Sequence, residues 1–410
     1  MFAGTILCHN QEKDCKARDV MTRPILTSVL LGLAAGMVTA IVLTLMHAFE
    51  QLIWFGEPGA LRIALTILAG GALIAVLRFR IPDDDFDTQL DQSREGARAP
   101  PSKAASMAAL GIVSVGFGGA IGPEAGILAV VAELSALISM RIAQDVKEAQ
   151  LIGQIGAAGA LGGLYGSPPG AASYTNDGPD APWPLLVLAA LAGLAGIMLA
   201  GMVLPDGPGM RIPLPATTLP FSPLQMLHAL AAGLAGALAG AVYVGGLHWF
   251  SHGLRAISRD VRLQVIVGTA VFALLAATFP VLRFNGQHEL AHLSEHGTAL
   301  GAGYLVLLAL LKVLALALCL SSKWLGGPIM PLAMGGAAAG AALAAMIPGM
   351  DLGLAAAAGV AACCTVGMNK PLVVLLVLIF MVTNLAPLPL VIGIMMGWLV
   401  SQFLPSERLH

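Results

Sequence analysis

A run of small residues with one proline, GGAIGPEAGILAV, occupies positions 118–130. Pro123 suits the first turn of a helix, because a backbone N–H at that position would have no acceptor within the helix. The N–H groups before it, near Ile121 and Gly122, are then expected to point out of the helix end, where the positive end of the helix dipole attracts anions. This segment predicts an anion site that contains no full positive charge.

A second segment of the same type, LGGPIMPLAMGG, occupies positions 325–336. Two such helix ends aimed at one point could hold a dehydrated anion within lipid and still release it, because main-chain dipoles bind more weakly than a lysine. The structural alternative is that Gly and Pro only pack or kink membrane helices. Each motif alone leaves the two interpretations balanced, and the spaced pair favours an anion site.

Glu124 follows Ile121 by about one helical turn and lies on nearly the same face. An acid inside an apolar helix is costly in lipid and usually has a function. Two interpretations stay open. The carboxylate could cap the first helical turn or serve at an entrance, or it could be a gate and proton site.

The segment 287–297, QHELAHLSEHG, contains the pattern HExxH at His288, Glu289 and His292. Many zinc hydrolases use this pattern on a helix, so a membrane zinc hydrolase is an alternative function. The segment lies in a polar connection, however, and no third acidic ligand is evident in a matching context. A short surface helix is the simpler interpretation, and we expect no bound metal and no cofactor.

Lys312 is a lone cation within the apolar run 299–320. In lipid such a side chain must reach the interface, pair with an acid or face water. It could raise the anion concentration in a vestibule, and a buried ion pair is an equal alternative.

Composition sets the class of protein that must position these groups. Of 410 residues, 57% are hydrophobic and only 11% are charged, against about 25% charged in a typical soluble domain. This excludes disordered chains, secreted mini-proteins and ordinary cytosolic enzymes, and it indicates a protein of the lipid bilayer. No basic stripe exists, so nucleic acid is not an expected partner. The few scattered cysteines form no disulfide or zinc framework.

Apolar segments separated by short polar breaks predict an all-α polytopic membrane protein. Several segments are shorter than the roughly 20 residues that a full span of the hydrocarbon needs, which indicates broken and partial-span helices around a buried or wet site. Basic residues before the first segment favour a cytoplasmic N-terminus, and a Pro-rich stretch divides the chain near its middle. The expected parts are a cytoplasmic N-terminal segment, a first membrane repeat, a connecting loop, a second membrane repeat and a tail, at 1–24, 25–204, 205–222, 223–404 and 405–410.

An internal repeat supports this division. In the first half, the Gly-Pro motif at 122–123 is followed by a segment that begins at Gly156 and reaches a proline at Pro168. In the second half, the motif at 326–328 is followed at nearly the same interval by a segment from Gly359 to Pro371, in which the spacing of Gly and Pro is identical. Transporters built from two structural repeats usually hold their substrate at mid-membrane, where broken helices meet. The alternative is coincidence in a chain rich in Gly and Ala.

The chain resembles the CLC family of chloride channels and chloride/proton antiporters, in a divergent bacterial branch. Residues 119–123, GAIGP, match the family motif G-[RK]-E-G-P, and residues 326–331, GGPIMP, are similar to its motif G-G-x-F-x-P. Residues 80–82, RIP, match the end of G-S-G-I-P, and 369–372 and 387–404 resemble the last two helices. The resemblance implies a homodimer of subunits with two inverted repeats and one anion pathway each.

The resemblance also marks departures from the family. The positions of its ion-binding serine and tyrosine hydroxyls are Phe79 and Leu385 here, and Pro328 replaces a residue with a backbone N–H. The resemblance leaves main-chain groups as candidate anion ligands, at Ala120, Ile121, Gly122, Ile329 and Met330. Phe79, Pro328 and Leu385 are expected to line the pathway.

The glutamate that gates the pathway in the family falls at Ile121, which cannot titrate. The second glutamate of its proton route falls at Gly178, next to Asp177. The resemblance therefore predicts weak or absent proton coupling by the usual route, because coupled exchange needs ionisable groups along a path. Glu124 and Asp177 are the remaining candidates for a gate or proton site.

The expected function is passive permeation of small inorganic anions, chloride by default, across the bacterial inner membrane. The alternative within transport is a proton-coupled anion antiporter that uses Glu124. The alternative from another class is the zinc hydrolase described above.

Overall fold

The structure is a computed structural model that describes residues 2–79, 101–176, 182–204, 210–220, 222–384 and 386–404. Within these ranges the chain forms fifteen α-helices and two short 3₁₀ helices, with isolated bridges but no named strand. The elements are α1 (Phe2–Ile53), α2 (Ala60–Leu77), α4 (Pro101–Gly116), α5 (Glu124–Ile142), α6 (Val146–Tyr165), α7 (Pro168–Thr175), α8 (Trp183–Gly201), α9 (Pro223–Ile257), α10 (Val261–Thr278), η1 (Pro280–Leu282), α11 (Gln287–His296), η2 (Gly297–Leu300), α12 (Ala302–Ser321), α13 (Ile329–Met346), α14 (Leu352–Met368), α15 (Pro371–Met381) and α16 (Pro387–Ser401).

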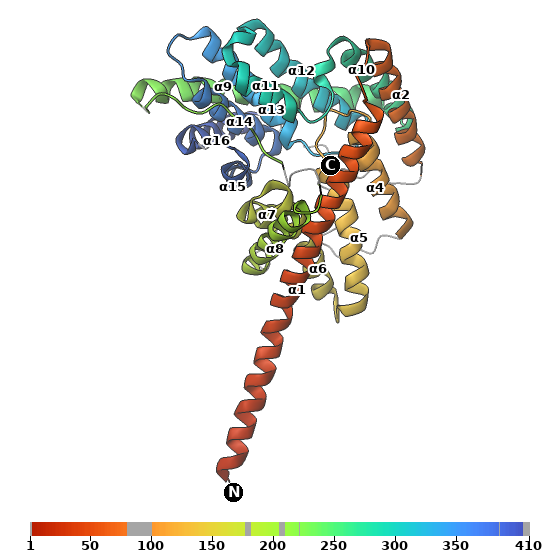
Figure 1. The fold of residues 1–410 in the computed structure, drawn as a ribbon, viewed down its shortest axis with the longest axis vertical. Coiled ribbons are helices and arrows are strands. Elements are labelled where there is room, and N and C mark those ends of the chain that lie inside the picture. The colour runs from red at the N-terminus through yellow and green to blue at the C-terminus, as the bar shows by residue number, and fades with distance from the viewer. Residues whose placement is uncertain are drawn as a thin grey trace.

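The apolar segments of the sequence form helices, as predicted. Eight of the described helices are long and apolar enough to cross a membrane, and four shorter apolar helices accompany them. The predicted boundary after residue 24 is not a helix boundary, because α1 continues through Pro24 from Phe2. Figure 1 shows the start of α1 extending away from the other helices. The short helix α7 carries too few large apolar residues to stand out in the sequence.

The two halves of the chain use the same packing plan. In the first half, α1 packs against α6 and α8, and α4 packs against α5. In the second half, α9 packs against α14 and α16, and α12 packs against α13. Each helix named in the second half therefore corresponds to the helix of the first half whose label number is lower by eight. Figure 1 shows the second half, α9 to α16, gathered together beyond α5 to α8.

The corresponding helices α6 and α14 begin and end with matching caps. The side chain of Asp145 accepts a hydrogen bond from the Glu148 N–H at the start of α6, and Asp351 accepts one from the Leu354 N–H at the start of α14. Both helices end at a left-handed residue, Gly166 with φ 62° and Asn369 with φ 52°. Pro168 and Pro371 then begin α7 and α15. The equal Gly-to-Pro spacing seen in the sequence thus encodes the same helix–break–helix unit twice.

Glycines let the central helices of each half approach closely. A Cβ atom added at Gly193 of α8 would collide with the backbone of Gly159 in α6. In the second half, a Cβ atom at Gly236 of α9 would collide with the backbone of Gly359 in α14. Helices in lipid associate through such close packing, because lipid tails provide no hydrophobic driving force.

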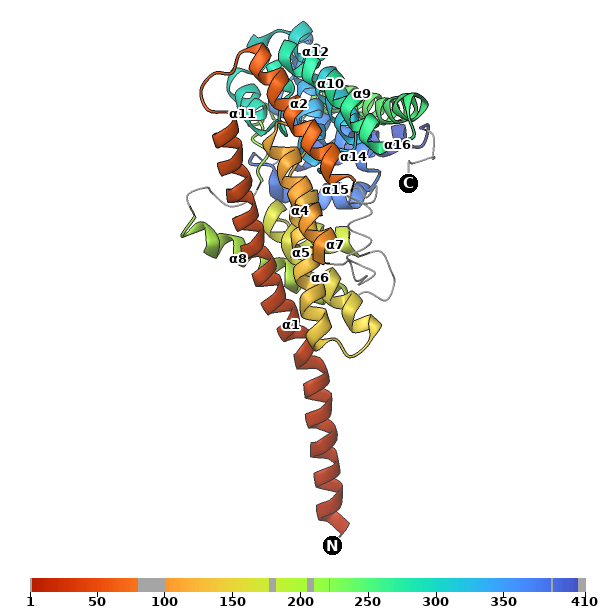
Figure 2. The same ribbon diagram turned by 90° about the vertical axis from the view of Figure 1, so that its right-hand side faces the viewer.

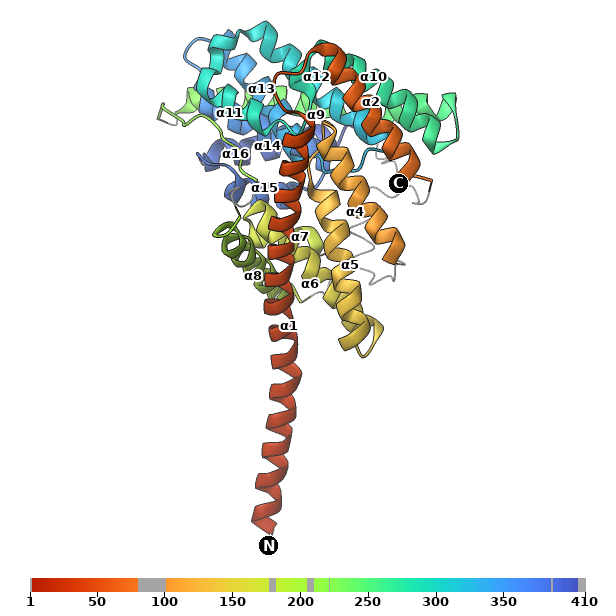
Figure 3. The ribbon, with the colours of Figure 1, turned by 45° about the vertical axis from the view of Figure 1, so that its right-hand side comes forward.

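The halves meet through helix pairs that are distant in sequence. The short helices α7 and α15 pack together, and the Ser167 hydroxyl donates a hydrogen bond of 2.7 Å to the Leu376 carbonyl. Helix α2 packs against α10 and lies with the second half (Figure 2). Figure 3 shows α1 passing along α4, α5 and α6 toward α13. The starts of α5 and α13 are buried inside the molecule.

Candidate functional site

The two Gly-Pro motifs meet through paired backbone. The Gly122 N–H donates to the Gly327 carbonyl at 2.8 Å, and the Gly327 N–H donates to the Gly122 carbonyl at 3.0 Å. Each glycine is followed by the proline that caps its helix, Pro123 for α5 and Pro328 for α13. This exchange joins two points that lie in different halves of the chain. We call the place where these two helix starts meet the junction.

The pairing uses some of the amides that were expected to bind the anion. The Gly122 N–H is taken by Gly327, and the Ile121 N–H donates to the Gly119 carbonyl at 2.8 Å. The expectation that both N–H groups are free is therefore wrong. The backbone hydrogen bonds from Ile127 to Pro123 and from Leu332 to Pro328 are the first of each helix. The N–H groups ahead of them have no acceptor within their helices, at residues 124–126 of α5 and at Ile329 and Met330 of α13.

The carboxyl group of Glu124 lies in the junction. Glu124 is fully buried, and neither carboxyl oxygen has a hydrogen-bond partner among the described residues. A Cβ atom added at Gly122 or at Gly327 would collide with its oxygen Oε2. The side chain therefore packs against both halves of the backbone exchange.

This geometry bears on the two interpretations of Glu124. The cap of α5 is Pro123, and no side chain makes a capping hydrogen bond there. The carboxyl group lies close enough to its own N–H and to the Gly327 N–H to feel both dipoles, but neither contact has the geometry of a hydrogen bond. A buried acid without a partner is costly, and such groups are typical of functional sites.

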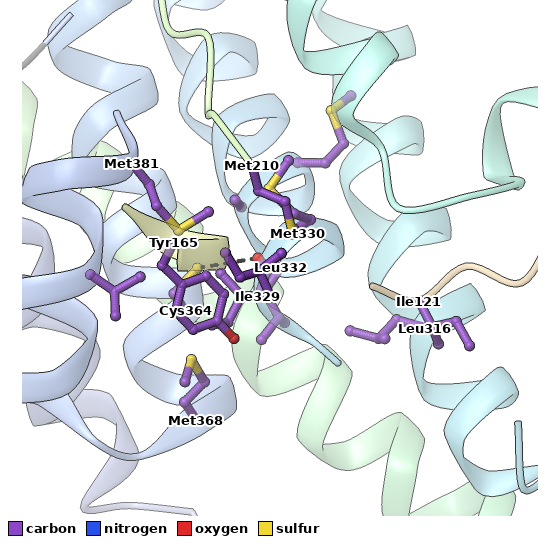
Figure 4. Close-up of a cluster of buried hydrophobic side chains, with 14 of the residues drawn as sticks. Ile121, Tyr165, Met210, Leu316, Ile329, Met330, Leu332, Cys364, Met368 and Met381 are labelled. Carbon is purple, nitrogen blue, oxygen red and sulfur yellow. Dashed lines mark hydrogen bonds between the residues drawn. The ribbon is translucent and has the colours of Figure 1, made fainter. Parts of the chain in front are cut away.

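The other candidate residues of the two motifs are buried around the junction. Ala120 and Ile121 are inaccessible to solvent, and the Ile121 side chain lies against Gly326. Figure 4 shows Ile121 beside Leu316 of α12, while Ile329 and Met330 belong to another part of the same cluster. The Cys364 thiol lies 3.8 Å from the Ile329 carbonyl. The backbone of both motifs is thus held by apolar packing.

Sequence reasoning missed the apolar surroundings of Ile329. Figure 4 shows the Tyr165 ring in a buried cluster with four methionines, Met210, Met330, Met368 and Met381. Methionine sulfur is polarisable and the side chain adapts its shape. Met330 lies in the second Gly-Pro motif and Met368 in the repeat segment 359–371, but nothing in the sequence marked the four methionines as a group.

The expected pathway-lining residues differ in their surroundings. Phe79 is 74% exposed at the end of α2, with the Arg262 guanidinium 5.7 Å from its ring centroid. It therefore does not share the burial of Ile121 and Ile329. Pro328 lies at the junction as the cap of α13. Leu385 and Asp177 lie outside the described residues.

The HExxH segment forms the short helix α11, as the simpler interpretation predicted. The rings of His292 and His296 stack with centroids 4.0 Å apart. In the part of the chain that the structure describes, no group of three or more His, Cys, Asp or Glu side chains could hold a metal ion. The zinc pattern is therefore not completed by ligands from other described elements.

Comparisons with known proteins decide the family. The family model described as "Voltage gated chloride channel" matches residues 87–402, which is most of the chain. The chain belongs to this family. CLC proteins are channels and transporters, so the zinc hydrolase alternative is wrong and the protein is not an enzyme.

Relatives and solved structures agree with this membership of the CLC family. The chain is 25% identical to "Putative ion-transport protein YfeO" of Escherichia coli strain SMS-3-5 / SECEC, over 94% of each chain. The same protein of Escherichia fergusonii is 25% identical over 92% of each chain. The fold is similar to a CLC-type fluoride/proton antiporter, with a TM-score of 0.72, 19% identity and coverage of 93% and 96%. It is also similar to a slow cyanobacterial Cl⁻/H⁺ antiporter, with a TM-score of 0.74, 16% identity and coverage of 93% and 94%.

Membership fixes the coarse function. The chain is a multi-pass membrane protein of the CLC anion-transport family. The family comprises channels and proton antiporters. At the junction, the residues of this chain differ from the general motif of the family.

Proposed function

We propose that this protein carries small inorganic anions, with chloride as the default, through the junction of α5 and α13. The single observation that carries the proposal is the mutual hydrogen bonding of Gly122 and Gly327. It holds two helix N-termini at one buried point, where their partial positive charges add. Candidate ligands are the first-turn amides, among them those of Ile329 and Met330, together with main-chain groups near Ala120.

We further propose that Glu124 is the gate. A carboxylate at the junction is itself an anion held where the helix dipoles are most favourable. A permeating anion must displace it or wait until a proton neutralises it, because two negative charges in a low dielectric repel strongly. Neither carboxyl oxygen of Glu124 makes a capping hydrogen bond of good geometry, which favours this role over simple capping. A titratable gate favours proton-linked transport over ungated permeation, with Asp177 as a second candidate proton site.

The wider architecture of the transporter is part of the proposal. The matching contacts of α1–α8 and α9–α16 support two structural repeats, and we propose inverted topology for them. We propose a homodimer in the bacterial inner membrane, with one pathway in each subunit. Cross-linking of the purified protein in lipid tests the dimer, and a single monomeric species would contradict it.

Flux from liposomes tests the anion proposal. The protein is reconstituted into liposomes loaded with chloride, fluoride or nitrate, and anion and proton movements are recorded together. We expect chloride to leave faster than from protein-free liposomes, and protons to move in the opposite direction. Retention of all three anions would contradict transport through this protein, and anion efflux without proton movement would favour ungated permeation.

A further inference from the structure

Lys312 is a buried cation held by main-chain carbonyls. It lies in the middle of α12 and is inaccessible to solvent. Its Nζ donates to four successive carbonyl oxygens at 3.3, 3.4, 3.2 and 3.1 Å, those of Val281, Leu282, Arg283 and Phe284. We call these four oxygens the carbonyl cage.

The cage replaces the partners that the sequence suggested. Among the described residues no acid lies within ion-pair distance of Lys312, and Glu289 of α11 acts on its charge from farther away. It does not reach solvent either, so the ammonium neither snorkels nor faces a vestibule. An ammonium has only three N–H groups, so four oxygens around it share its donors, as they would around a small metal cation.

The segment that forms the cage packs on the turn that leads to the junction. The Phe284 N–H donates to the Gly118 carbonyl at 3.2 Å. The Arg283 guanidinium lies 4.6 Å from the Trp54 ring centroid, and Trp54 Nε1 donates to the Gly116 carbonyl at 2.9 Å. The cage segment therefore contacts Gly118 directly and Gly116 through Trp54, immediately before the motif 119–123.

Gly286, two residues after the cage, lies against both Lys312 and α13. Gly286 has φ 92°, and a Cβ atom there would lie 2.9 Å from the Met334 Cβ and 3.1 Å from the Lys312 Cε. Met334 belongs to the first turns of α13, shortly after Pro328. Lys312 thus lies where α12, α13 and the cage segment meet.

We propose that Lys312 is a positioning residue whose ammonium acts as a tethered monovalent cation, ordering the carbonyl cage and through it the backbone that enters α5. The charge is what the cage requires. Four carbonyls that converge on one point repel each other unless a cation or several donors occupy that point. An apolar side chain of equal length fills the space and leaves these oxygens unsatisfied. The effect on anions rests on the proposed function of the junction.

Lys312→Met separates charge from bulk, because Met has a similar length and no donor. We expect chloride efflux to fall by about tenfold or more, with a higher half-saturating chloride concentration. Leu308→Ala is the matched control, since Leu308 is buried one turn earlier on α12 and its truncation removes volume without touching the cage. We expect Leu308→Ala to keep the half-saturating concentration of the unaltered protein. A Lys312→Met protein with unaltered efflux and concentration dependence would overturn the proposal.

Lys312→Ala permits replacement of the tethered cation by a free one. We expect methylammonium to raise the thermal unfolding temperature of purified Lys312→Ala and to restore part of its efflux. Tetramethylammonium at the same concentration controls for ionic strength, because it has no N–H donor. Equal responses to the two cations, or a thermal shift without recovery of efflux, would overturn the positioning role. Failure of the unaltered protein to transport any anion would refute the proposed function instead, and the thermal shift would still test the cage.

Discussion

The starts of α5 and α13 share a backbone and differ in their side chains. Both begin with a Gly-Pro pair, and the two glycines exchange hydrogen bonds. The residue after the proline is Glu124 in α5 and Ile329 in α13. The carboxyl group of Glu124 packs against both glycines, whereas Ile329 lies in an apolar cluster with Tyr165 (Figure 4).

The comparison separates two parts of the proposed mechanism. In the proposal, backbone that both halves provide forms the binding place, because helix dipoles depend on main-chain geometry alone. We propose that a titratable side chain, which only the first half provides, controls access to it. The caps of α6 and α14 also differ between the halves: both use Asp, but Asp145 is exposed and Asp351 is buried.

The largest effect is expected from Gly327→Ala. Its Cβ atom would collide with the Glu124 carboxyl group, so either the side chain or the backbone exchange must move. Overpacking together with weakened hydrogen bonds is expected to cost about 4 kcal/mol in the free energy of unfolding. Denaturant titration in mixed micelles measures this, and efflux should be lost in parallel.

A double variant tests the cause of that loss. All three nearest atoms that the added Cβ meets belong to Glu124, so Glu124→Ala in the same chain should recover at least about 1 kcal/mol as a coupling energy. Gly245→Ala is the matched control, because nothing lies within 4 Å of its Cβ position. Additive losses in the double variant would show that the clash with Glu124 is not the cause.

A smaller effect distinguishes the two Asp caps. Asp351 accepts hydrogen bonds from the Leu354 N–H and also from the Thr218 N–H, the Thr218 hydroxyl and the Leu219 N–H. Asp145 accepts from the Glu148 N–H. We expect Asp351→Ala to lower the free energy of unfolding by about 3 kcal/mol and Asp145→Ala by about 1 kcal/mol. Equal losses of unfolding free energy in the two variants, measured by denaturant titration, would contradict this difference between the halves.

The cap of α14 should also respond to pH. Burial raises the pKa of Asp351, but the hydrogen bonds from Leu354, Thr218 and Leu219 outweigh it and hold the pKa below its ordinary value. A lowered pKa in the folded state stabilises the protein above the unfolded value of about 3.9. That contribution is lost as the pH falls through the folded pKa. The stability difference between the unaltered protein and Asp351→Ala should therefore shrink below about pH 4, and a constant difference would contradict this.

The sequence predicted the helices well because lipid requires long or broken apolar segments with internal hydrogen bonding. The sequence also predicted that the two Gly-Pro motifs form a pair. Gly and Pro favour a helix start through their own backbone properties, which can be recognised in each motif separately. Their order and spacing resembled a known family, which the family model confirmed.

The remaining features depend on contacts between distant residues. The exchange between Gly122 and Gly327 uses amides that local reasoning left free, because each acceptor lies in the other half of the chain. The cage around Lys312 consists of main-chain oxygens, which carry no signature in a sequence. The methionines around Tyr165 come from separate elements and ordinary apolar positions. Such groupings become visible only when the chain is folded.

Glu124→Gln provides the most direct test of the central claim, which is that a carboxylate occupies the anion's place at the junction. Glutamine keeps the size of the side chain and removes its charge and proton exchange. The matched control is Glu133→Gln, a half-buried acid on the same helix. Chloride efflux and proton movement are recorded together from liposomes between about pH 4 and pH 7, where protein carboxyl groups titrate.

In the unaltered protein and in Glu133→Gln, we expect efflux to increase as the pH falls and protons to move against chloride. In Glu124→Gln, we expect efflux that does not vary with pH and carries no protons. A Glu124→Gln protein that keeps both the pH dependence and the proton movement would contradict the account.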